Sequence, residues 1–422
     1  MNVAAPQNTT IRTGVARVLE QKRRFLVPSV YHFYCDPPLI VRGDGCELID
    51  SEGRRYLDLY SGVGAMSLGH SHPDVLAAAH RQIEELQHTT TIYLTPPMFD
   101  LAERLAELAP AEINRSFFCA SGTEANESAL LMASQFTGRE QFLSLDRGLH
   151  GRTKAAMSVT QIPMWRTDPF LLNTCTRVPG YDDQSSLQSI ERELRTRNYA
   201  AVIAEPIQGN GGIIMPPTGY WQTLRKLCDD TDTLLIADEV QTGINRTGTF
   251  FAVNHEHVTP DFITTAKALG NGFPIAACLT TDRIADTCKR PAAATYGANP
   301  IACAVALAVL EFHQENNLAA EAMQKGIHLE VNLQRLAQRN DIITSIRGRG
   351  LMIGVELGDG SNGAAAVITD RVLEAMKDSG FLLGKTGLGR NVVTFMPPLV
   401  ITAQQLDTAC EQFEQVLDSM KK

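Results

Sequence analysis

The sequence predicts an α/β protein in which a large, mostly parallel sheet is joined to a smaller α+β unit. Two observations support this fold class. In the middle of the 422-residue chain, short apolar runs alternate with segments of helical apolar spacing, as in GYWQTLRKLCDD followed by TLLIADE. Strands that are separated by helices pair in parallel and are covered on both faces. Near the C-terminus the pattern changes, because paired strands follow two long helical segments.

The N-terminal elements are a helix over 13–24 and a β-meander. Short alternating runs that are broken by glycine and by Ser-Glu-Gly predict the meander in CELIDSEGRRYLDLYSG. A helix follows in HPDVLAAAHRQIEELQ, because its apolar residues have helical spacing and a proline stands near its start.

The remaining elements follow in alternation and then as the smaller unit. Strands are predicted in RSFFCA, QFLSLD, AAVIAEP and TLLIADE, with helices in TEANESALLMASQF and GYWQTLRKLCDD. The last part is expected to contain helices over 300–313, 319–338 and 364–377, strands in IITSIRGRGLMIGVEL and over 391–396, and a final helix. We therefore place a large domain at 60–310, with the N-terminal segment 1–59 packing with a small C-terminal domain at 311–422.

The composition excludes several classes of protein. Hydrophobic residues make up 44% of the chain, which is enough for a large core, and the net charge of −9 with no basic run disfavours nucleic-acid binding. No apolar run is long enough for a membrane helix, and the N-terminus lacks the apolar stretch of a secretory signal. From these two absences we expect a soluble, cytoplasmic protein. The nine cysteines are scattered without a CxxC pair, so we expect no metal site.

The first chemical motif is SGTEANE, which follows a predicted strand and opens a helix. Free N–H groups and the helix dipole make such a helix start an anion site. Gly122 allows close approach of an anion to the backbone, and Thr123 adds a hydroxyl. The alternative is an ordinary serine N-cap with no ligand.

Two further motifs bring a carboxylate and a lysine. Asp238 ends the buried run LLIAD, where ligands of α/β proteins bind, although it could serve only as an N-cap or ion-pair partner. Lys267 lies among small and apolar residues in TTAKALGNGFP; desolvation would make it a nucleophile, and the alternative is a surface lysine. An anion cradle, a strand-end aspartate and a desolvated lysine together match the needs of pyridoxal phosphate.

These motifs stand in a longer ordered series that resembles the class III aminotransferases, a branch of the fold-type I pyridoxal-phosphate enzymes. The resemblance covers nearly the whole chain, and HTTTIYL is most similar to the alanine–glyoxylate aminotransferase 2-like subgroup. The matching motifs are IVRGDGCELIDSEGRRYLDLYSGVGAMSLGHSHPDV, SGTEANE, LHGRT, EPIQGNGG, IADEVQTGINRTG, TTAKALGNGFP, TYGANPIACA and MPPLVIT.

The resemblance implies a role for each matching residue. Lys267 would attach the cofactor and Asp238 would pair with its ring nitrogen, as the two catalytic residues. Thr295 would reach the cofactor phosphate of the partner subunit, so the active enzyme would be a homodimer. The other implied cofactor-binding residues are Gly122, Thr123, Leu149, His150, Gly151, Glu205 and Gln241.

Two positions depart from the family pattern. The residue before His-Gly is usually aromatic, whereas Leu149 can cover the cofactor ring but cannot stack on it. Thr394 stands where many of these transaminases carry an arginine that binds the substrate carboxylate, and losing such a contact in a buried site costs about 2–5 kcal/mol. A neighbour such as Arg390 or Lys385 could supply the charge instead.

The absence of that arginine led us to expect a lyase rather than a transaminase. The expected reaction is the elimination of a leaving group from a small amine that carries a phosphonate or phosphate, with 1-hydroxy-2-aminoethylphosphonate giving phosphonoacetaldehyde and ammonia as the favoured case. The alternative is an ω-amino-acid or alanine–glyoxylate-type transaminase that uses pyruvate or 2-oxoglutarate. The candidate substrate-binding residues are Tyr31, Tyr34, Arg152, Arg390 and Thr394.

Overall fold

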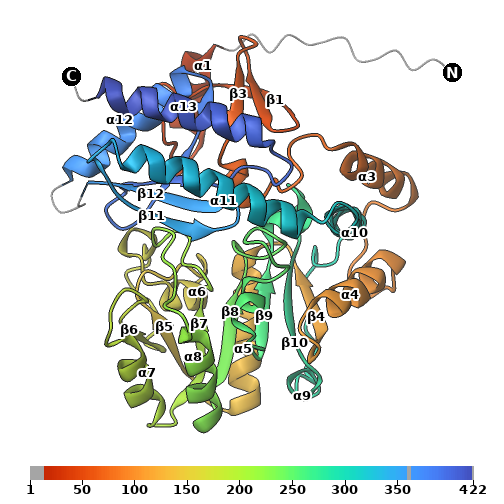
Figure 1. Ribbon diagram of the computed structural model, residues 1–422. Coiled ribbons are helices and arrows are strands. Elements are labelled where there is room, and N and C mark those ends of the chain that lie inside the picture. The colour runs from red at the N-terminus through yellow and green to blue at the C-terminus, as the bar shows by residue number, and fades with distance from the viewer. Residues whose placement is uncertain (1–13, 359–362, 421–422) are drawn as a thin grey trace.

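The computed structural model describes residues 14–358 and 363–420, and a seven-stranded sheet forms its centre (Figure 1). Four neighbouring pairs of strands are parallel, and only β10 runs against both of its neighbours. The strands, in spatial order, are β4 (Ile113–Cys119), β10 (Ala276–Thr281), β9 (Phe262–Thr265), β8 (Leu234–Asp238), β7 (Tyr199–Ala204), β5 (Gln141–Leu145) and β6 (Cys175–Val178).

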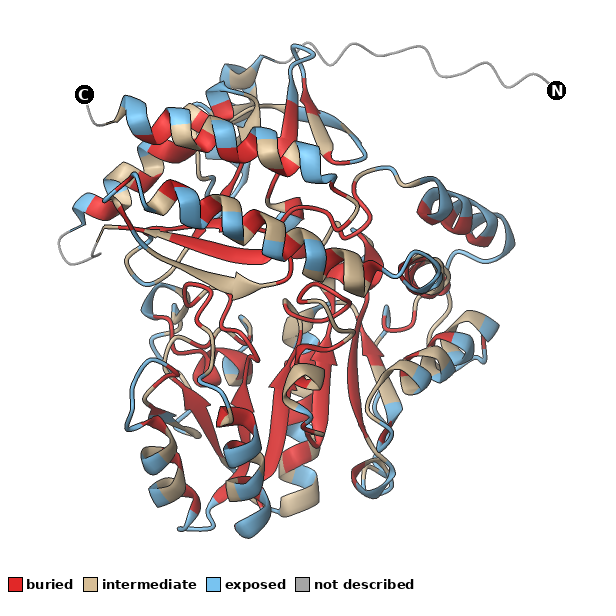
Figure 2. Ribbon diagram, in the orientation of Figure 1, coloured by how far each residue is buried: buried red, intermediate tan, exposed pale blue. Residues whose placement is uncertain are grey.

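Helices cover this sheet. Its five inner strands are almost wholly buried, while the helices alternate between buried and exposed positions (Figure 2). The helix α5 (Gly122–Thr137) packs against β4, β7, β9 and β10. The other helical elements of this part are α6 (Lys154–Val159), α7 (Ser186–Leu194), α8 (Tyr220–Asp230), α9 (Asp282–Ala285), η1 (Pro163–Trp165), η2 (Ala252–Glu256) and η3 (Lys267–Gly270).

The ends of α5 are fixed by local sequence. The Ser121 side chain accepts a hydrogen bond from the Glu124 N–H, which satisfies one donor of the first turn. Gly138 ends the helix in the left-handed conformation, with a φ of 70° that a residue without a Cβ adopts at no steric cost. The start of α5 is therefore rigid, and its remaining free N–H groups point beyond the end of β4.

Two four-stranded sheets lie beyond the central one. The first contains β1 (Ile40–Asp44), β2 (Glu47–Asp50), β3 (Arg55–Asp58) and β13 (Phe381–Leu382), and the second contains β11 (Ile343–Arg349), β12 (Met352–Leu357), β15 (Val392–Phe395) and β14 (Gly384–Thr386). Because β13 pairs with β3 in parallel, Phe381 lies opposite Leu57. A C-terminal strand thus completes the N-terminal sheet.

The helices outside the central sheet link these parts (Figure 1). They are α1 (Val15–Phe25), α2 (Ser61–Gly64), α3 (Pro73–Glu85), α4 (Pro96–Leu108), α10 (Pro300–Glu315), α11 (Leu318–Ala337), α12 (Ala364–Asp378) and α13 (Ala403–Ser419). Helix α10 serves two hydrophobic cores: Leu310 packs in the core of the central sheet, and Val309 packs in the core of the C-terminal elements. A boundary at residue 310 therefore falls inside a helix, and the division of the chain into domains remains a prediction.

The predicted α/β fold is confirmed, with differences in detail. The elements without a prediction include α4, α7, β6, β9 and β10, and the antiparallel direction of β10 was not foreseen. Alternating burial distinguishes antiparallel strands that face water, but β10 is buried along most of its length and gives no such signal. Within 14–358 and 363–420, no helix is both long and apolar enough to cross a membrane.

Candidate active site

The carboxyl ends of β5, β7 and β8, the start of α5 and the turn after β9 border one cavity of about 540 Å³. Ligands of parallel sheets bind at this end of the strands, because loops and helix starts converge there. Eleven residues that the sequence analysis selected line this cavity: Tyr31, Gly122, Thr123, Leu149, His150, Gly151, Arg152, Glu205, Asp238, Gln241 and Lys267. Segments more than two hundred residues apart are thus brought to one site.

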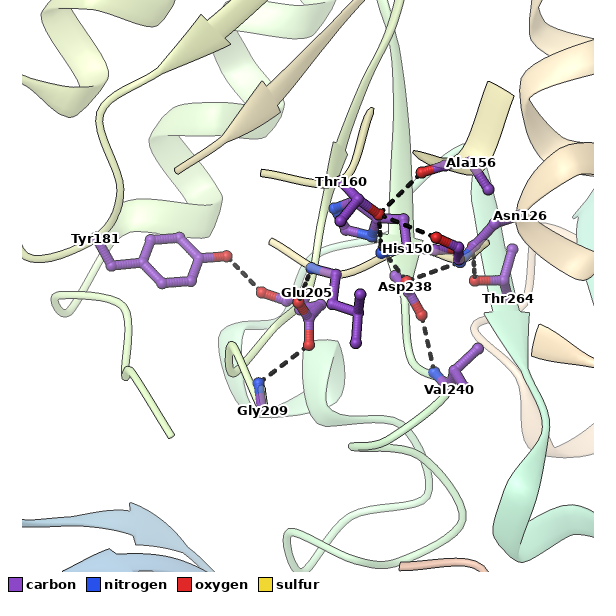
Figure 3. Close-up of polar contacts among 12 residues, drawn as sticks. Asn126, His150, Ala156, Thr160, Tyr181, Glu205, Gly209, Asp238, Val240 and Thr264 are labelled. Atoms are coloured by element: carbon purple, nitrogen blue, oxygen red, sulfur yellow. Dashed lines mark hydrogen bonds and ion pairs between the residues drawn. The ribbon is translucent and has the colours of Figure 1, made fainter. Parts of the chain in front are cut away.

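Asp238 ends β8 and is buried, and its carboxylate has a donor on each oxygen (Figure 3). Its Oδ2 accepts from His150 Nδ1 at 2.8 Å and from Asn126 Nδ2 at 2.8 Å. Its Oδ1 accepts from the Val240 N–H at 3.2 Å. Because both carboxylate oxygens are used, these donors hold the Asp238 side chain in one orientation.

Asn126, which the sequence analysis did not select, organises this network. Its side-chain amide donates to Asp238 and to the His150 carbonyl at 2.7 Å, and its Oδ1 accepts from the Thr264 hydroxyl at 2.6 Å (Figure 3). All of these groups are buried. The signal for Asn126 was its place inside SGTEANE, one turn after the helix start, where it faces the same cavity as Gly122.

Lys267 opens the 3₁₀ turn η3 after β9 and is strained. Its φ of 47° lies in the left-handed region, which costs a residue with a Cβ roughly 1–2 kcal/mol. Burial lowers the pKa of its ε-ammonium, and the negative charges of Asp238 and Glu205 oppose that effect. A lysine with a lowered pKa is available as a neutral nucleophile and proton acceptor.

Glu205 follows β7 and is the second buried carboxylate of the cavity. It accepts from the backbone N–H groups of Leu149 at 2.8 Å and Gly209 at 3.0 Å, while Tyr181 donates to its backbone carbonyl (Figure 3). Burial raises the pKa of Glu205 to about 7, despite the opposing effect of His150. Glu205 can therefore carry either charge state near neutral pH.

The residues around the cavity fit pyridoxal phosphate. The start of α5 presents the N–H groups of Gly122 and Thr123, which is the arrangement that holds a phosphate. Gln241 Oε1 is buried without a hydrogen-bond partner among the described residues, and a Cβ on Gly209 would lie only 1.7 Å from it. A cofactor hydroxyl would satisfy this oxygen, and glycine at 209 keeps the space that the glutamine needs.

Aromatic rings form one wall of the cavity. Trp165 lies 6.1 Å from Tyr31, Tyr31 lies 5.8 Å from Phe33, and Phe33 lies 5.9 Å from Tyr60, measured between ring centroids. All four line the cavity. Of these, sequence analysis selected only Tyr31, since the four rings come from distant segments and share no motif.

Four selected residues do not line this cavity. The Tyr34 hydroxyl donates to the Leu383 carbonyl, so this ring packs between segments. Thr394 is buried in β15, with a hydroxyl that has no partner among the described residues. Arg390 is exposed. Burial raises the pKa of Tyr31, and the positive charge of Arg390 partly opposes that effect. Thr295 is exposed, and its predicted reach into a partner subunit stays a prediction.

Two other basic residues, Lys385 and Arg166, already have partners. Lys385 pairs with Asp370 of α12. Arg166 donates to the carbonyls of Ser158 and Thr160. Arg152 lines the cavity and has no ion pair or side-chain hydrogen bond within 14–358 and 363–420. Its guanidinium is therefore available to a substrate anion.

Comparisons with known proteins agree with this geometry. The family model for class III aminotransferases matches residues 33–417. An acetylornithine aminotransferase from Methanopyrus kandleri is 38% identical over 90% of this chain and 94% of its own length. The mitochondrial alanine–glyoxylate aminotransferase 2 homolog 2 of Arabidopsis thaliana is 36% identical over 96% of this chain and 87% of its own.

Solved structures give the same result for the fold. An ornithine aminotransferase from Toxoplasma gondii superposes with a TM-score of 0.90 at 30% identity, and each chain is covered completely. A PLP-bound amine transaminase from an uncultivated Pseudomonas species superposes with a TM-score of 0.86 at 32% identity, over 91% of this chain and 95% of its own.

Proposed function

Because the chain belongs to the class III aminotransferases, whose cofactor is pyridoxal 5′-phosphate, we propose that it transfers the amino group of an ω-amino acid to pyruvate or 2-oxoglutarate. One observation carries this proposal: Arg152, whose guanidinium has no partner among the residues that the structure describes, lines the same cavity as Lys267 and Asp238. The names of the relatives also support the transaminase alternative over the expected lyase, because those relatives are aminotransferases.

The cofactor, when bound, supplies an electron sink for the carbon that bears the substrate amine. Asp238 would pair with the protonated ring nitrogen, because three hydrogen bonds orient its carboxylate at the edge of the cavity. Gly122 and Thr123 would hold the phosphate, and Gln241 would hydrogen-bond the ring hydroxyl. Lys267 Nζ would take the proton from the substrate carbon, since its lowered pKa keeps a neutral fraction available.

Arg152 and the aromatic wall suggest how the substrate is held. The rings of Tyr31 and Trp165 offer an apolar surface to the methylene groups of an ω-amino acid. A planar guanidinium can bind the carboxylate at the far end through two parallel hydrogen bonds. The same group can bind the carboxylate of the keto acid in the second half of the reaction, which removes the need for an arginine at position 394.

The experiment is a steady-state comparison of Arg152→Gln, Arg152→Lys and the wild type with β-alanine or 4-aminobutyrate and pyruvate. Losing a charged hydrogen-bond pair of about 1.5–3 kcal/mol should raise KM roughly 10- to 150-fold in Arg152→Gln, with a smaller rise in Arg152→Lys. Arg192→Gln is the matched control, because Arg192 is an exposed arginine that pairs with its neighbour Glu193. An unchanged KM for both substrates in Arg152→Gln would remove the carboxylate-binding role.

A second candidate function is the ammonia-lyase, favoured by one observation at Thr394. Its buried hydroxyl has no partner within 14–358 and 363–420, and no arginine stands there to bind an α-carboxylate. A small phosphonate-bearing amine such as 1-hydroxy-2-aminoethylphosphonate needs no such contact. Ammonium that accumulates from this amine without any keto acid would favour the lyase, and a requirement for a keto acid would exclude it.

The proposed enzyme is a homodimer in which Thr295 completes the site of the partner. Support comes from large side chains that remain exposed: Tyr296, next to Thr295, is 66% exposed, and Tyr93 and Leu94 are 67% and 81% exposed. Tyr93 and Leu94 follow His88, whose ring lies 5.2 Å from that of Tyr296 between centroids. Mixed dimers of Thr295→Ala and Lys267→Ala chains test the proposal. Shared sites would give each mixed dimer one intact site and restore part of the lost activity, whereas unshared sites would leave the mixture no more active than its components.

A further inference from the structure

We propose that Asn271 is a positioning residue for Lys267. Asn271 connects the turn η3, which begins at Lys267, to the segment 67–69. Ser67 and His313 complete this arrangement, which we call the turn clamp. The inference rests on the role of Lys267 in the proposed function. The turn clamp would keep that lysine in its unfavourable backbone conformation.

The turn η3 is strained at its start and at its end. Lys267 has a φ of 47°, and Asn271, which follows the turn, has a φ of 41°. Backbone conformations of this kind persist only where the surrounding structure fixes them. The turn itself is short, and 3₁₀ geometry gives poorer hydrogen bonds than an α-helix. Contacts from outside the turn must therefore hold it.

Asn271 provides two such contacts to one segment. Its Oδ1 accepts from the Leu68 N–H at 2.9 Å, and its Nδ2 donates to the Gly69 carbonyl at 3.0 Å. The side chain is only 3% exposed, so water does not compete for these bonds. Because donor and acceptor are both used, the amide has a single satisfied orientation, and the end of the turn is fixed to residues about 200 positions earlier in the chain.

Ser67 and His313 add a second connection near the start of the turn. The Ser67 hydroxyl lies 3.4 Å from the Ala268 carbonyl and 3.0 Å from His313 Nε2. Since Asn245 Nδ2 can only donate to His313 Nδ1, at 3.0 Å, the histidine proton lies on Nε2 and points to Ser67. The serine proton is then free to reach Ala268, the residue after the lysine.

The segment that holds the turn is itself anchored elsewhere. The Leu399 N–H donates to the Ser67 carbonyl at 2.7 Å, and the Ser61 hydroxyl donates to the Met396 carbonyl at 2.6 Å. The segment 61–69 therefore lies between the catalytic turn and the residues around the Pro-Pro pair of the C-terminal part. The backbone position of Lys267 and its strain therefore depend on residues 61–69 and 396–399, which lie outside the central sheet.

The test uses the holoenzyme of Asn271→Asp, which retains the shape and the tolerance of the left-handed conformation but loses the donor to Gly69. Ser67→Ala is the smaller second change. The control is Asn340→Asp, a fully buried asparagine of the C-terminal part whose Nδ2 donates to the Leu336 carbonyl. Four quantities are measured: Tm, the pH midpoint of the visible absorbance of the bound cofactor, kcat and KM.

Both turn-clamp variants should shift the pH midpoint of the cofactor absorbance and lower kcat about tenfold with little change in KM, as a misplaced catalytic group does. Asn340→Asp should lower Tm without moving the midpoint or kcat. If the pH midpoint of the cofactor absorbance in Asn271→Asp and Ser67→Ala equals that of Asn340→Asp, the inference is overturned. The absorbance needs no substrate, so it tests the clamp even if the proposed transamination is wrong.

Discussion

His150 and Asp238 share a buried hydrogen bond of 2.8 Å between Nδ1 and Oδ2. The imidazole proton must lie on Nδ1, because the carboxylate oxygen can only accept while it is ionised. The His150 backbone is fixed at the same time, since its N–H donates to Thr160 and its carbonyl accepts from Asn126. The pair therefore sets the orientation of the carboxylate that lines the cavity.

Replacing Asp238 with Asn should weaken cofactor binding. The amide cannot carry the charge that pairs with a protonated ring nitrogen, and it places a donor opposite the donors of His150 and Asn126. A lost charged contact of about 1.5–3 kcal/mol corresponds to a roughly 10- to 150-fold larger Kd. Titration of the apoprotein with pyridoxal phosphate, followed by absorbance, measures it; equal Kd values would speak against the assigned role.

Replacing Lys267 with Ala should abolish covalent attachment of the cofactor and all turnover. Borohydride reduction followed by peptide mass analysis should find the cofactor on Lys267 in the wild type and on no peptide in the variant. Lys226→Ala is the control, since Lys226 is an exposed lysine of α8. Cofactor found on another lysine of the wild-type protein would refute the assignment.

Replacing Glu205 with Gln should change how stability depends on pH. Burial raises the pKa of Glu205 from 4.5 to about 7, so the folded state keeps a proton that the unfolded chain loses between these values. Its stabilising contribution is full below about pH 4.5 and is lost as the pH rises through about 7. The free energy of unfolding of the wild type should therefore fall relative to Glu205→Gln, by up to about 1.4 kcal/mol per pH unit between these limits.

Urea unfolding at several pH values between 5 and 7.5 measures this difference. Glu239, whose pKa burial also raises to about 7, contributes the same dependence to both proteins and cancels. Parallel curves for wild type and variant would show that Glu205 titrates at its ordinary value in the folded state.

The sequence predicted the centre of the site better than its walls. Lys267, Asp238 and the start of α5 are each marked by local chemistry, because a strand end or helix start places them at the edge of the sheet. Asn126 was missed because one asparagine on a helix carries no motif of its own. Its role depends on Thr264 and Asp238, which only the folded chain brings to it.

The substrate side was predicted only in part, because Tyr31 and Arg152 line the cavity but the rest of its wall was missed. Trp165, Phe33 and Tyr60 form a wall only through tertiary packing of separate segments. Thr394 was selected from its place in the family pattern, yet it is buried in β15 and does not line the cavity, while Arg152 does. The charge that a single position lacks can be supplied from another segment, which sequence position alone does not reveal.

The most direct test of the central claim is to mix the holoenzyme with an ω-amino acid in excess and no keto acid, and to count the amine consumed. A transaminase stops after about one amine per active site, because the amino group stays on the enzyme until an acceptor arrives. The account predicts this stop, followed by renewed turnover when pyruvate or 2-oxoglutarate is added. Continued consumption of a candidate amine with steady release of ammonium would contradict it and establish a lyase.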